Sequence, residues 1–350
     1  RDMNTATTSL VSVSAASSTT TAAGRSEFPQ VSRDGSTVVF QSLASDLDAS
    51  VTDSNSQWDV FAFDVSGSSI STLSVDAGGT ATADAGILYG EVSISDDGQV
   101  VAFSSSSTNL DPLDGNSAQD VFVRAAGVTS LVSIDSTGTG AGDGPSGRPS
   151  ISGNGNIVAF QTYASNLGTL SNGQLQVVVR DRLLLTTALV SVNSDGSAVG
   201  NDASQNARIS HDGNTVAFES FATDLDGTIS SDANGDVDVF MRDWNAPSPV
   251  TRLLSRSTSA GVAGNLRANQ PELSDDGSIV VFVSVSSDLV SLADVNGASA
   301  DIFVYDGSSL SAVTVKGSGT YTGRAGTLDG FAVSDTGEVV AFASSSPGLV

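Results

Sequence analysis

A Ser-x-x-Gly turn followed by an alternating strand occurs six times in this 350-residue chain, and it is the feature that most limits the fold. Four copies read Ser-x-Asp-Gly, whereas the third and sixth have Asn154 and Thr336 in place of the aspartate. The turn glycines are separated by 63, 57, 58, 64 and 60 residues and are Gly35, Gly98, Gly155, Gly213, Gly277 and Gly337. Such a period is typical of repeat proteins whose units differ in loop length. We therefore expect one domain, 1–350, built from six similar units.

Each unit contains four short segments with strand character and no helical periodicity. In the fourth unit they are 206–210, 215–220, 237–243 and 249–256, and Asp212-Gly213 forms the tight turn between the first two. Asp-Gly suits hairpins that need positive φ, and four short antiparallel strands per repeat are typical of a propeller blade. The sequence predicts an all-β, six-bladed β-propeller. The expected blades are 28–90, 91–148, 149–207, 208–270 and 271–330, with 331–350 and 1–27 sharing the sixth.

A longer pattern runs through nearly the whole chain. It reads Ser-x-Asp-Gly-x-x-Val-Ala-Phe-x-Ser, then Asn/Asp-Leu, then Asp-x-Asn-(Gly)-x-x-Asp-Val-Phe-Val-Arg-Asp. This pattern resembles the TolB-type, WD40-like propeller repeat of bacteria and archaea. The resemblance implies the propeller fold but no single function, because that repeat serves binding proteins, scaffolds and enzymes.

The sixth unit lacks a third strand. Residues 8–13 match a fourth strand, and residues 331–350 match a first and a second strand. The missing strand either lies outside the ends of this sequence or is inserted by a neighbouring molecule, as in strand complementation. The second alternative predicts homo-oligomers or filaments.

Charge and composition exclude several classes of partner. The net charge of −25 repels nucleic-acid backbones and anionic lipid, and no apolar run approaches the ~18 residues that a membrane span needs. The absence of cysteine excludes disulfides, thiolate metal sites and a cysteine nucleophile. Small polar residues dominate, and Lys316 is the only lysine. These features favour an extracellular or cell-surface protein, or alternatively a periplasmic one.

Aspartate and asparagine recur in the loop between the second and third strands. They are Asp53, Asn55 and Asp59; Asp114, Asn116 and Asp120; Asp232, Asn234, Asp236 and Asp238; and Asp294, Asn296 and Asp301. Alternating carboxylate and amide oxygens suit Ca²⁺, whereas the same residue types also form Asx turns and cap backbone amides. Both interpretations stay open.

Two further observations bear on the calcium hypothesis. Asp48, Asp111 and Asp226 lie just upstream of three of the loops and offer additional oxygens. The third unit has Leu170 and Gln176 at the positions of the two carboxylates, so it serves as an internal control that should bind no calcium.

The sequence contains no established catalytic motif. The only histidine, His211, is the second residue of a hairpin turn, where a solvated turn residue is expected, and neither Gly-x-Ser-x-Gly nor His-Glu-x-x-His occurs. Four arginines precede the innermost strands and either gather around an anionic ligand or neutralise local aspartates; they are Arg25, Arg148, Arg267 and Arg324.

Three functional hypotheses follow. The favoured one is a non-enzymatic scaffold that binds protein or glycan through the face carrying the Asp/Asn loops and the long segments before each first strand. The second is a repeating subunit of a filament or surface layer joined through the incomplete sixth unit. The third is a carbohydrate-active enzyme with an acidic channel site, because paired carboxylates are its usual machinery.

Overall fold

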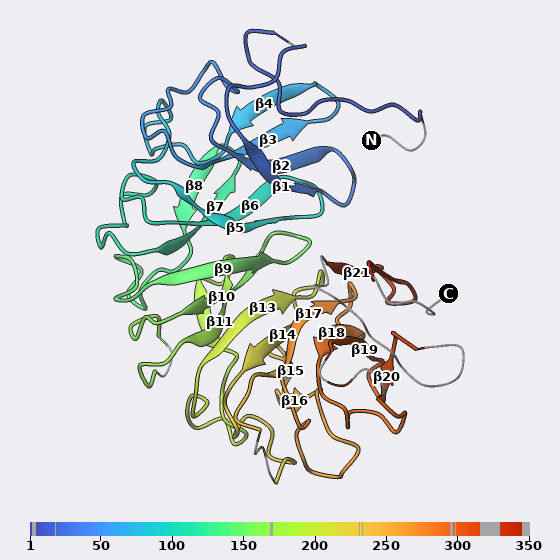
Figure 1. Ribbon diagram of the computed structural model, residues 1–350. Helices are drawn as coiled ribbons and strands as arrows, with labels where there is room; N and C mark the ends of the chain where they lie inside the picture. Colours follow the sequence, from blue (N-terminus) through green and yellow to red (C-terminus); the bar gives the residue numbers. More distant parts are fainter. Residues whose placement is uncertain are drawn as a thin grey trace. The chain divides into compact units, whose positions relative to one another are not determined.

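The computed structural model describes residues 1, 5–17, 19–168, 171–230, 232, 234–294, 297, 299–315 and 330–344 (Figure 1). Contacts divide the chain into two compact units, Arg1–Ile151 and Ser152–Val350, and each is described by itself. The described residues contain strands and no helix, as the sequence predicts.

The first unit contains two complete sheets and one further strand. The first sheet consists of β1 (Ser26–Val31), β2 (Thr37–Ser42), β3 (Asp59–Asp64) and β4 (Ser69–Thr72). The second sheet consists of β5 (Ile87–Ile94), β6 (Val100–Ser105), β7 (Asp120–Ala125) and β8 (Val128–Leu131), and β9 (Ser146–Ile151) follows.

The second unit carries the remaining strands. The third sheet has the order β12-β11-β10-β9, with β10 (Ile157–Thr162), β11 (Gln176–Asp181) and β12 (Thr186–Leu189). The fourth sheet contains β13 (Ser204–Ile209), β14 (Thr215–Ser220), β15 (Asp238–Asp243) and β16 (Thr251–Leu253). The fifth contains β17 (Ala268–Leu273), β18 (Val280–Ser284), β19 (Asp301–Tyr305) and β20 (Leu310–Ala312), and the sixth contains β21 (Phe331–Val333) and β22 (Val340–Phe342).

In the part of the chain that the structure describes, five four-stranded sheets and one two-stranded sheet, antiparallel and in chain order, confirm the predicted six-bladed β-propeller fold class. The first strands of the five four-stranded sheets begin a few residues upstream of the expected blade boundaries, whereas β21 begins at residue 331 as expected. Val13 and Thr21 form an isolated bridge like those that follow the fourth strands of the first four sheets, such as Val75 with Thr82. This bridge resembles the segment that follows a fourth strand, whereas the fourth strand expected at residues 8–13 and its pairing with β21 and β22 stay a prediction.

A buried serine holds each hairpin between the first and second strands. Ser210, which is 1% exposed, donates its hydroxyl to Asp212 Oδ1 at 2.5 Å and accepts the Thr215 N–H at 3.0 Å. Gly213 has φ of 80°, which a residue with a side chain rarely adopts. The same pair of serine bonds occurs at Ser32, Ser95, Ser152 and Ser274. This network explains why the turn sequence recurs.

The core of each unit lies between successive sheets and is built around phenylalanine pairs. Phe218 and Phe240 occupy directly paired positions of β14 and β15, and their rings stack at 5.8 Å. Equivalent pairs are Phe40 with Phe61, Phe103 with Phe122, and Phe282 with Phe303. The second and third strands carry apolar runs such as Val216–Phe218 and Val239–Met241 that are buried along their length, because each sheet packs against neighbours on both faces.

Each innermost strand contains a residue in the left-handed region, which interrupts the alternation that the sequence analysis used to place it. These residues are Phe28, Gly90, Arg148, Asn206 and Gln270, with φ between 51° and 77°. In β1, β5, β13 and β17 they lie within β-bulges. A bulge turns backbone N–H groups out of the ladder, so that each needs a new acceptor.

A side chain from the preceding sheet accepts that N–H. Gln41 Oε1 accepts from Gly90, Gln161 Oε1 from Asn206 and Glu219 Oε1 from Gln270, at 2.9, 3.1 and 2.9 Å. In the second sheet the equivalent residue is Ser104, which is too short and leaves its buried hydroxyl unpartnered, and Glu91 instead accepts the Arg148 N–H at 2.9 Å. These bonds connect consecutive sheets within each unit.

Two substitutions of Glu219 should separate the loss of its acceptor oxygens from the loss of side-chain volume. Glu219 is 4% exposed and also accepts Asn206 Nδ2 at 2.7 Å, so Glu219→Ala should lower the free energy of unfolding by about 2–3 kcal/mol. Glu219→Gln keeps the acceptor for the Gln270 N–H, as Gln41 and Gln161 do in other sheets, but sets an amide N–H₂ toward Asn206 Nδ2. It should therefore cost about 1 kcal/mol, less than the alanine variant. Urea unfolding monitored by circular dichroism measures both. Equal losses would show that the acceptor oxygen is unimportant.

Candidate functional site

The Asp/Asn loops fold in the same way in four sheets. The asparagine side chain donates Nδ2 to a carbonyl in the segment after the fourth strand and accepts at Oδ1 the N–H two residues later. Asn55 donates to Ala83 O at 2.8 Å and accepts from Gln57 N at 2.6 Å. Asn116, Asn172 and Asn234 repeat both bonds. The asparagine therefore has a structural role, including in the third sheet, which lacks the carboxylates.

The aspartate that begins the third strand is buried beside a hydroxyl. Asp120 Oδ1 accepts the Ser133 hydroxyl at 2.6 Å, and Ser133 Oγ accepts the Val121 N–H at 2.9 Å. Asp59 with Ser74, Asp238 with Ser255, and Asp301 with Thr314 repeat this arrangement. Burial raises the pKa of Asp59, Asp120 and Asp238 to about 7, despite the hydroxyl bond that opposes this shift.

The first aspartate of each loop contributes a second carboxyl, and we call the two an acid pair: Asp53 with Asp59, Asp114 with Asp120, and Asp232 with Asp238. In each pair the negative charge of the first carboxyl further raises the pKa of the second. Three carboxylate oxygens in these pairs are buried without a hydrogen-bond partner: Asp114 Oδ2, Asp120 Oδ2 and Asp232 Oδ1.

The remaining predicted ligands, Asp236, Asp294 and Asn296, belong to none of the acid pairs. Asp236 Oδ1 accepts the N–H of Val237, and Asp294 Oδ1 accepts that of Gly297. Asn296 lies outside the described residues. Within the described residues, no three His, Asp or Glu side chains are arranged as a metal-binding group. The calcium hypothesis thus concerns pairs of acids with other oxygen donors.

The acids just upstream of the loops, Asp48, Asp111 and Asp226, accept hydrogen bonds from backbone N–H groups of their own sheets. Asp226, which is 5% exposed, accepts Leu253 N at 2.9 Å and pairs with Arg256 at 2.7 Å. Asp48 and Asp111 accept Thr72 N and Leu131 N in the same way, both at 2.8 Å. Burial alone raises the pKa of Asp226, but the bonds from Thr228, Leu253 and Arg256 outweigh it and place the pKa below its ordinary value.

The Asp226 carboxylate should therefore stabilise the fold in a pH-dependent manner. Because its pKa is lower in the folded than in the unfolded chain, its contribution is present at neutral pH and is lost as pH falls below about 4. We expect Asp226→Asn to lower the free energy of unfolding by about 1–3 kcal/mol at pH 7 and by less at pH 3. Denaturant titrations at both pH values measure this. A difference from the wild type that does not change with pH would contradict it.

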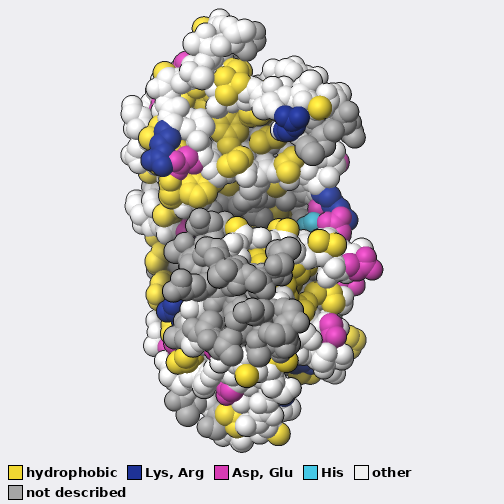
Figure 2. All heavy atoms as spheres, turned by 45° about the vertical axis from the view of Figure 1, so that its right-hand side comes forward, with side chains coloured by type: hydrophobic (Ala, Val, Ile, Leu, Met, Phe, Trp, Pro, Cys, Tyr) yellow, Lys and Arg dark blue, Asp and Glu magenta, His cyan; other side chains and the backbone are white. Residues whose placement is uncertain are grey.

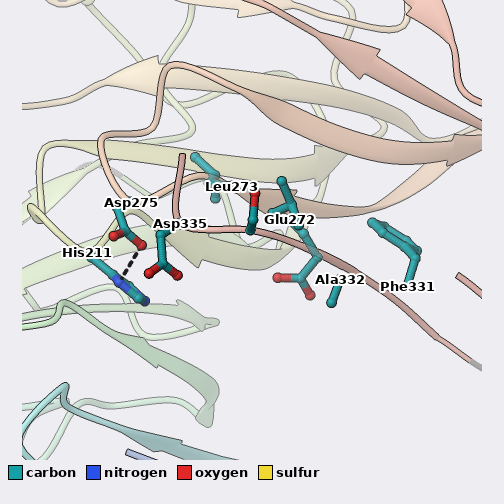
Figure 3. A pocket seen from close by; sticks show the side chains of 9 residues that line it. His211, Glu272, Leu273, Asp275, Phe331, Ala332 and Asp335 are labelled. Atoms are coloured by element: carbon teal, nitrogen blue, oxygen red, sulfur yellow. Dashed lines mark ion pairs between the residues drawn. The ribbon is translucent and has the colours of Figure 1, made fainter. Parts of the chain in front are cut away.

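A shallow cleft in the second unit contains His211. Figure 3 shows His211 and Asp275 pointing toward each other with Asp335 beside them, and Phe331 at the opposite end. His211 Nδ1 and Asp275 Oδ1 are 2.7 Å apart. Asp212 N–H donates to Asp275 O, and Asp275 N–H donates to Asp335 O, so turns of three successive sheets are joined. His211 thus occupies a turn-to-turn contact, in agreement with the structural role expected from the sequence.

Two of the four arginines before the innermost strands form ion pairs with glutamates of their own unit. Arg25 pairs with Glu27, and Arg148 Nε lies 3.8 Å from Glu91. The Arg267 carbonyl accepts the Ser284 hydroxyl, and Arg324 lies outside the described residues. These contacts support charge neutralisation at Arg25 and Arg148.

The first unit carries an exposed aromatic cluster that sequence reasoning missed. Phe28 in β1 and Tyr89 in β5 are 38% and 51% exposed, and their rings meet edge to face at 4.3 Å. Half-buried Trp58, which precedes β3, lies 5.3 Å from Tyr89. Figure 2 shows hydrophobic side chains in yellow among backbone and other side chains in white over the upper part of the picture. We call Phe28, Trp58 and Tyr89 the aromatic cluster.

Polar groups surround the aromatic cluster. The Tyr89 hydroxyl donates to Glu27, which also pairs with Arg25. Gln57 Oε1 accepts Gly86 N at 3.2 Å. A detectable signal existed in the sequence, because Trp58 replaces the Gln119, Leu175, Val237 and Ala300 of the other repeats. The cluster is a departure from the repeat, and departures are where a repeat protein acquires a site.

Comparison with known proteins shows similarity only at the level of structure. No family model matches the sequence, and no curated protein matches it significantly. An oligogalacturonate lyase in complex with manganese shares 10% identity over 90% of this chain and 69% of that chain, with a TM-score of 0.52. This likeness shows the fold alone.

Two TolB structures are similar as well. The putative TolB from Agrobacterium tumefaciens has 16% identity over 83% of this chain and 80% of its own, with a TM-score of 0.46. TolB from Acinetobacter baumannii has 11% identity over 81% of this chain and 52% of its own, with a TM-score of 0.43. Membership of the TolB-type repeat family remains a prediction from the sequence pattern. Among the described residues, no helix has the length and apolarity to cross a membrane.

Proposed function

We propose that this protein is a non-enzymatic binding scaffold, displayed outside the cell or in its envelope, that holds a neutral glycan on the aromatic cluster. The observation that carries the proposal is the exposure of Phe28 and Tyr89 next to Trp58. A chain with only 20 aromatic residues, 14 Phe, 4 Tyr and 2 Trp, places three of them together at the surface. Exposed aromatic groups of this kind mark binding surfaces.

The chemistry around the rings favours a sugar. One face of a pyranose ring presents C–H groups that pack on an aromatic ring, while its hydroxyls need acceptors and donors at the edge. Glu27, Gln57 and Arg25 supply such groups around Tyr89. The net charge of −25 disfavours polyanionic ligands, so a neutral glycan is the best match.

The left-handed residue of β1 presents an aromatic ring at this location. Phe28 has φ of 51°, like the equivalent residues of the other four-stranded sheets, but those residues are Gly90, Arg148, Asn206 and Gln270. An added Cβ at Gly90 would lie 3.5 Å from the Phe28 ring, so the backbone of β5 passes close beneath that ring. The bulges of β1 and β5 thereby set the position of two of the three rings.

The other two hypotheses have weaker support. The similar lyase acts on an oligogalacturonate, a polyanion that the charge of this chain repels. A filament joined at the sheet of β21 and β22 stays a prediction, and light scattering after size exclusion separates it from a discrete monomer.

Aromatic substitutions should abolish glycan binding selectively. Trp58→Ala and Tyr89→Ala should each weaken binding to the best neutral glycan found on an array by about 10- to 30-fold, because buried aromatic contacts dominate such interfaces. Tyr163→Ala is the matched control, because Tyr163 is 50% exposed in the other unit. Isothermal titration measures the affinities, and circular dichroism confirms that each variant is folded.

The tryptophans offer an independent readout. Trp244 donates Nε1 to Gly213 O at 2.9 Å, so it is a scaffold residue, and Trp244→Phe leaves Trp58 as the only indole. The fluorescence of Trp58 in this variant should change when the glycan is added. Unchanged affinity in both cluster variants, binding of proteins but of no glycan, or turnover of the glycan would each overturn the proposal.

A further inference from the structure

The acid pair of the second sheet contains two carboxylate oxygens that nothing in the described part of the chain satisfies. Asp114 is 4% exposed and Asp120 is fully buried. Asp114 Oδ1 accepts Asn116 N at 3.4 Å and Asp120 Oδ1 accepts Ser133 Oγ at 2.6 Å, whereas both Oδ2 atoms lack a partner. Buried carboxylates are normally paired or coordinated, because removing their charge from water costs several kcal/mol.

The third sheet shows how the same fold satisfies this position without a charge. Gln176 replaces Asp120: its Oε1 accepts the Ser191 hydroxyl at 2.7 Å, as Asp120 accepts that of Ser133. Its Nε2 donates to Asn172 Oδ1 at 3.0 Å. A neutral hydrogen-bond donor, the amide N–H₂ of Gln176, therefore replaces the second carboxylate oxygen in this sheet. In the sequence, Leu170 also replaces the first aspartate, so both acids are absent together.

The acid pairs of the first and fourth sheets share the arrangement. Asp59 is 2% exposed and Asp238 is fully buried, and each accepts a serine hydroxyl at Oδ1. In the fourth sheet, Asp232 Oδ1 is buried without a partner, and Asp238 Oδ2 is 3.3 Å from Asn234 Nδ2. Buried carboxylate oxygens without a partner therefore occur in the second and fourth sheets. In the first sheet, Asp53 Oδ1 accepts the N–H groups of Asn55 and Ser56.

We propose that the acid pairs of the second and fourth sheets each bind one Ca²⁺ ion, whereas the third sheet takes none. Two carboxylates balance the charge of the ion, and Ca²⁺ accepts the flexible, all-oxygen surroundings that a loop with waters and carbonyls provides, whereas Mg²⁺ demands a near-ideal octahedron. With two acids per site, we expect affinities of ~10⁻⁴–10⁻³ M, in the range of extracellular modules. The ions would fasten the start of the third strand to its loop.

The test uses the full chain and Ca²⁺ alone, at pH 8. Ten millimolar CaCl₂ should raise the melting temperature by about 3 °C or more relative to chelator. MgCl₂ should have a much smaller effect. Titration calorimetry should find about two sites per chain. Equal melting temperatures in calcium and chelator, or absence of bound calcium, would overturn the proposal.

An amide substitution at Asp120 gives the discriminating variant. Asp120→Asn reproduces the amide chemistry of Gln176, so it should raise the melting temperature in chelator, reduce the calcium stoichiometry by about one and shrink the calcium response. Asp202→Asn is the matched control, because Asp202 is exposed and accepts only the Ala203 N–H. Circular dichroism establishes that both variants fold.

Two outcomes distinguish calcium at the acid pairs from calcium bound elsewhere and from protonation of the pairs. If Asp120→Asn leaves the calcium response intact, the ions bind elsewhere and the proposal fails. If the stability gained in chelator at acidic pH equals that gained with calcium, a proton held by the pair is the correct explanation and the proposal fails. Because the readouts are stoichiometry and melting temperature, they are independent of whether the aromatic cluster binds a glycan.

Discussion

The structure depends on one kind of hydrogen bond, which backbone N–H groups at strand ends and bulges donate to buried polar side chains. Short strands leave many N–H groups at their ends, and sheets that pack face to face place those groups away from water. Serine at the hairpins, serine with aspartate at the start of each third strand, and Gln or Glu at the bulges satisfy them. The richness of the chain in Ser, Thr and Asp is therefore a structural requirement as much as a solubility feature.

The same principle explains where the candidate sites lie. In four sheets a left-handed residue of the innermost strand directs its N–H to the preceding sheet. The equivalent left-handed residue in β1 is Phe28, whose ring meets Tyr89 of β5. The same position of the repeat thus connects sheets in four cases and presents an aromatic ring in β1.

The acid pairs show the reverse situation, in which the repeat leaves a polar group unsatisfied. Four repeats retain two carboxyls, Asp294 and Asp301 included, where the third repeat has Leu170 and Gln176. Burial and mutual repulsion raise the pKa of Asp59, Asp120 and Asp238 to about 7, which is costly for the bare protein. In the second and fourth sheets a bound cation offsets that cost, as we propose.

The sequence by itself determined the repeat, the hairpins, the four strands per unit and the fold class, because Asp-Gly turns and period-two alternation are local signals. It also located the Asp/Asn loops and the exceptional third unit. Only the tertiary structure decided which oxygens are engaged: Asp48, Asp111 and Asp226 bind backbone N–H groups, whereas Asp114 and Asp120 keep unpartnered atoms. Likewise, successive members of the aromatic cluster, Phe28, Trp58 and Tyr89, are about 30 residues apart in sequence. Only the packing of two sheets makes them one surface. Contacts between residues distant in sequence have no local signature, since they arise from how sheets stack and where bulges turn the chain.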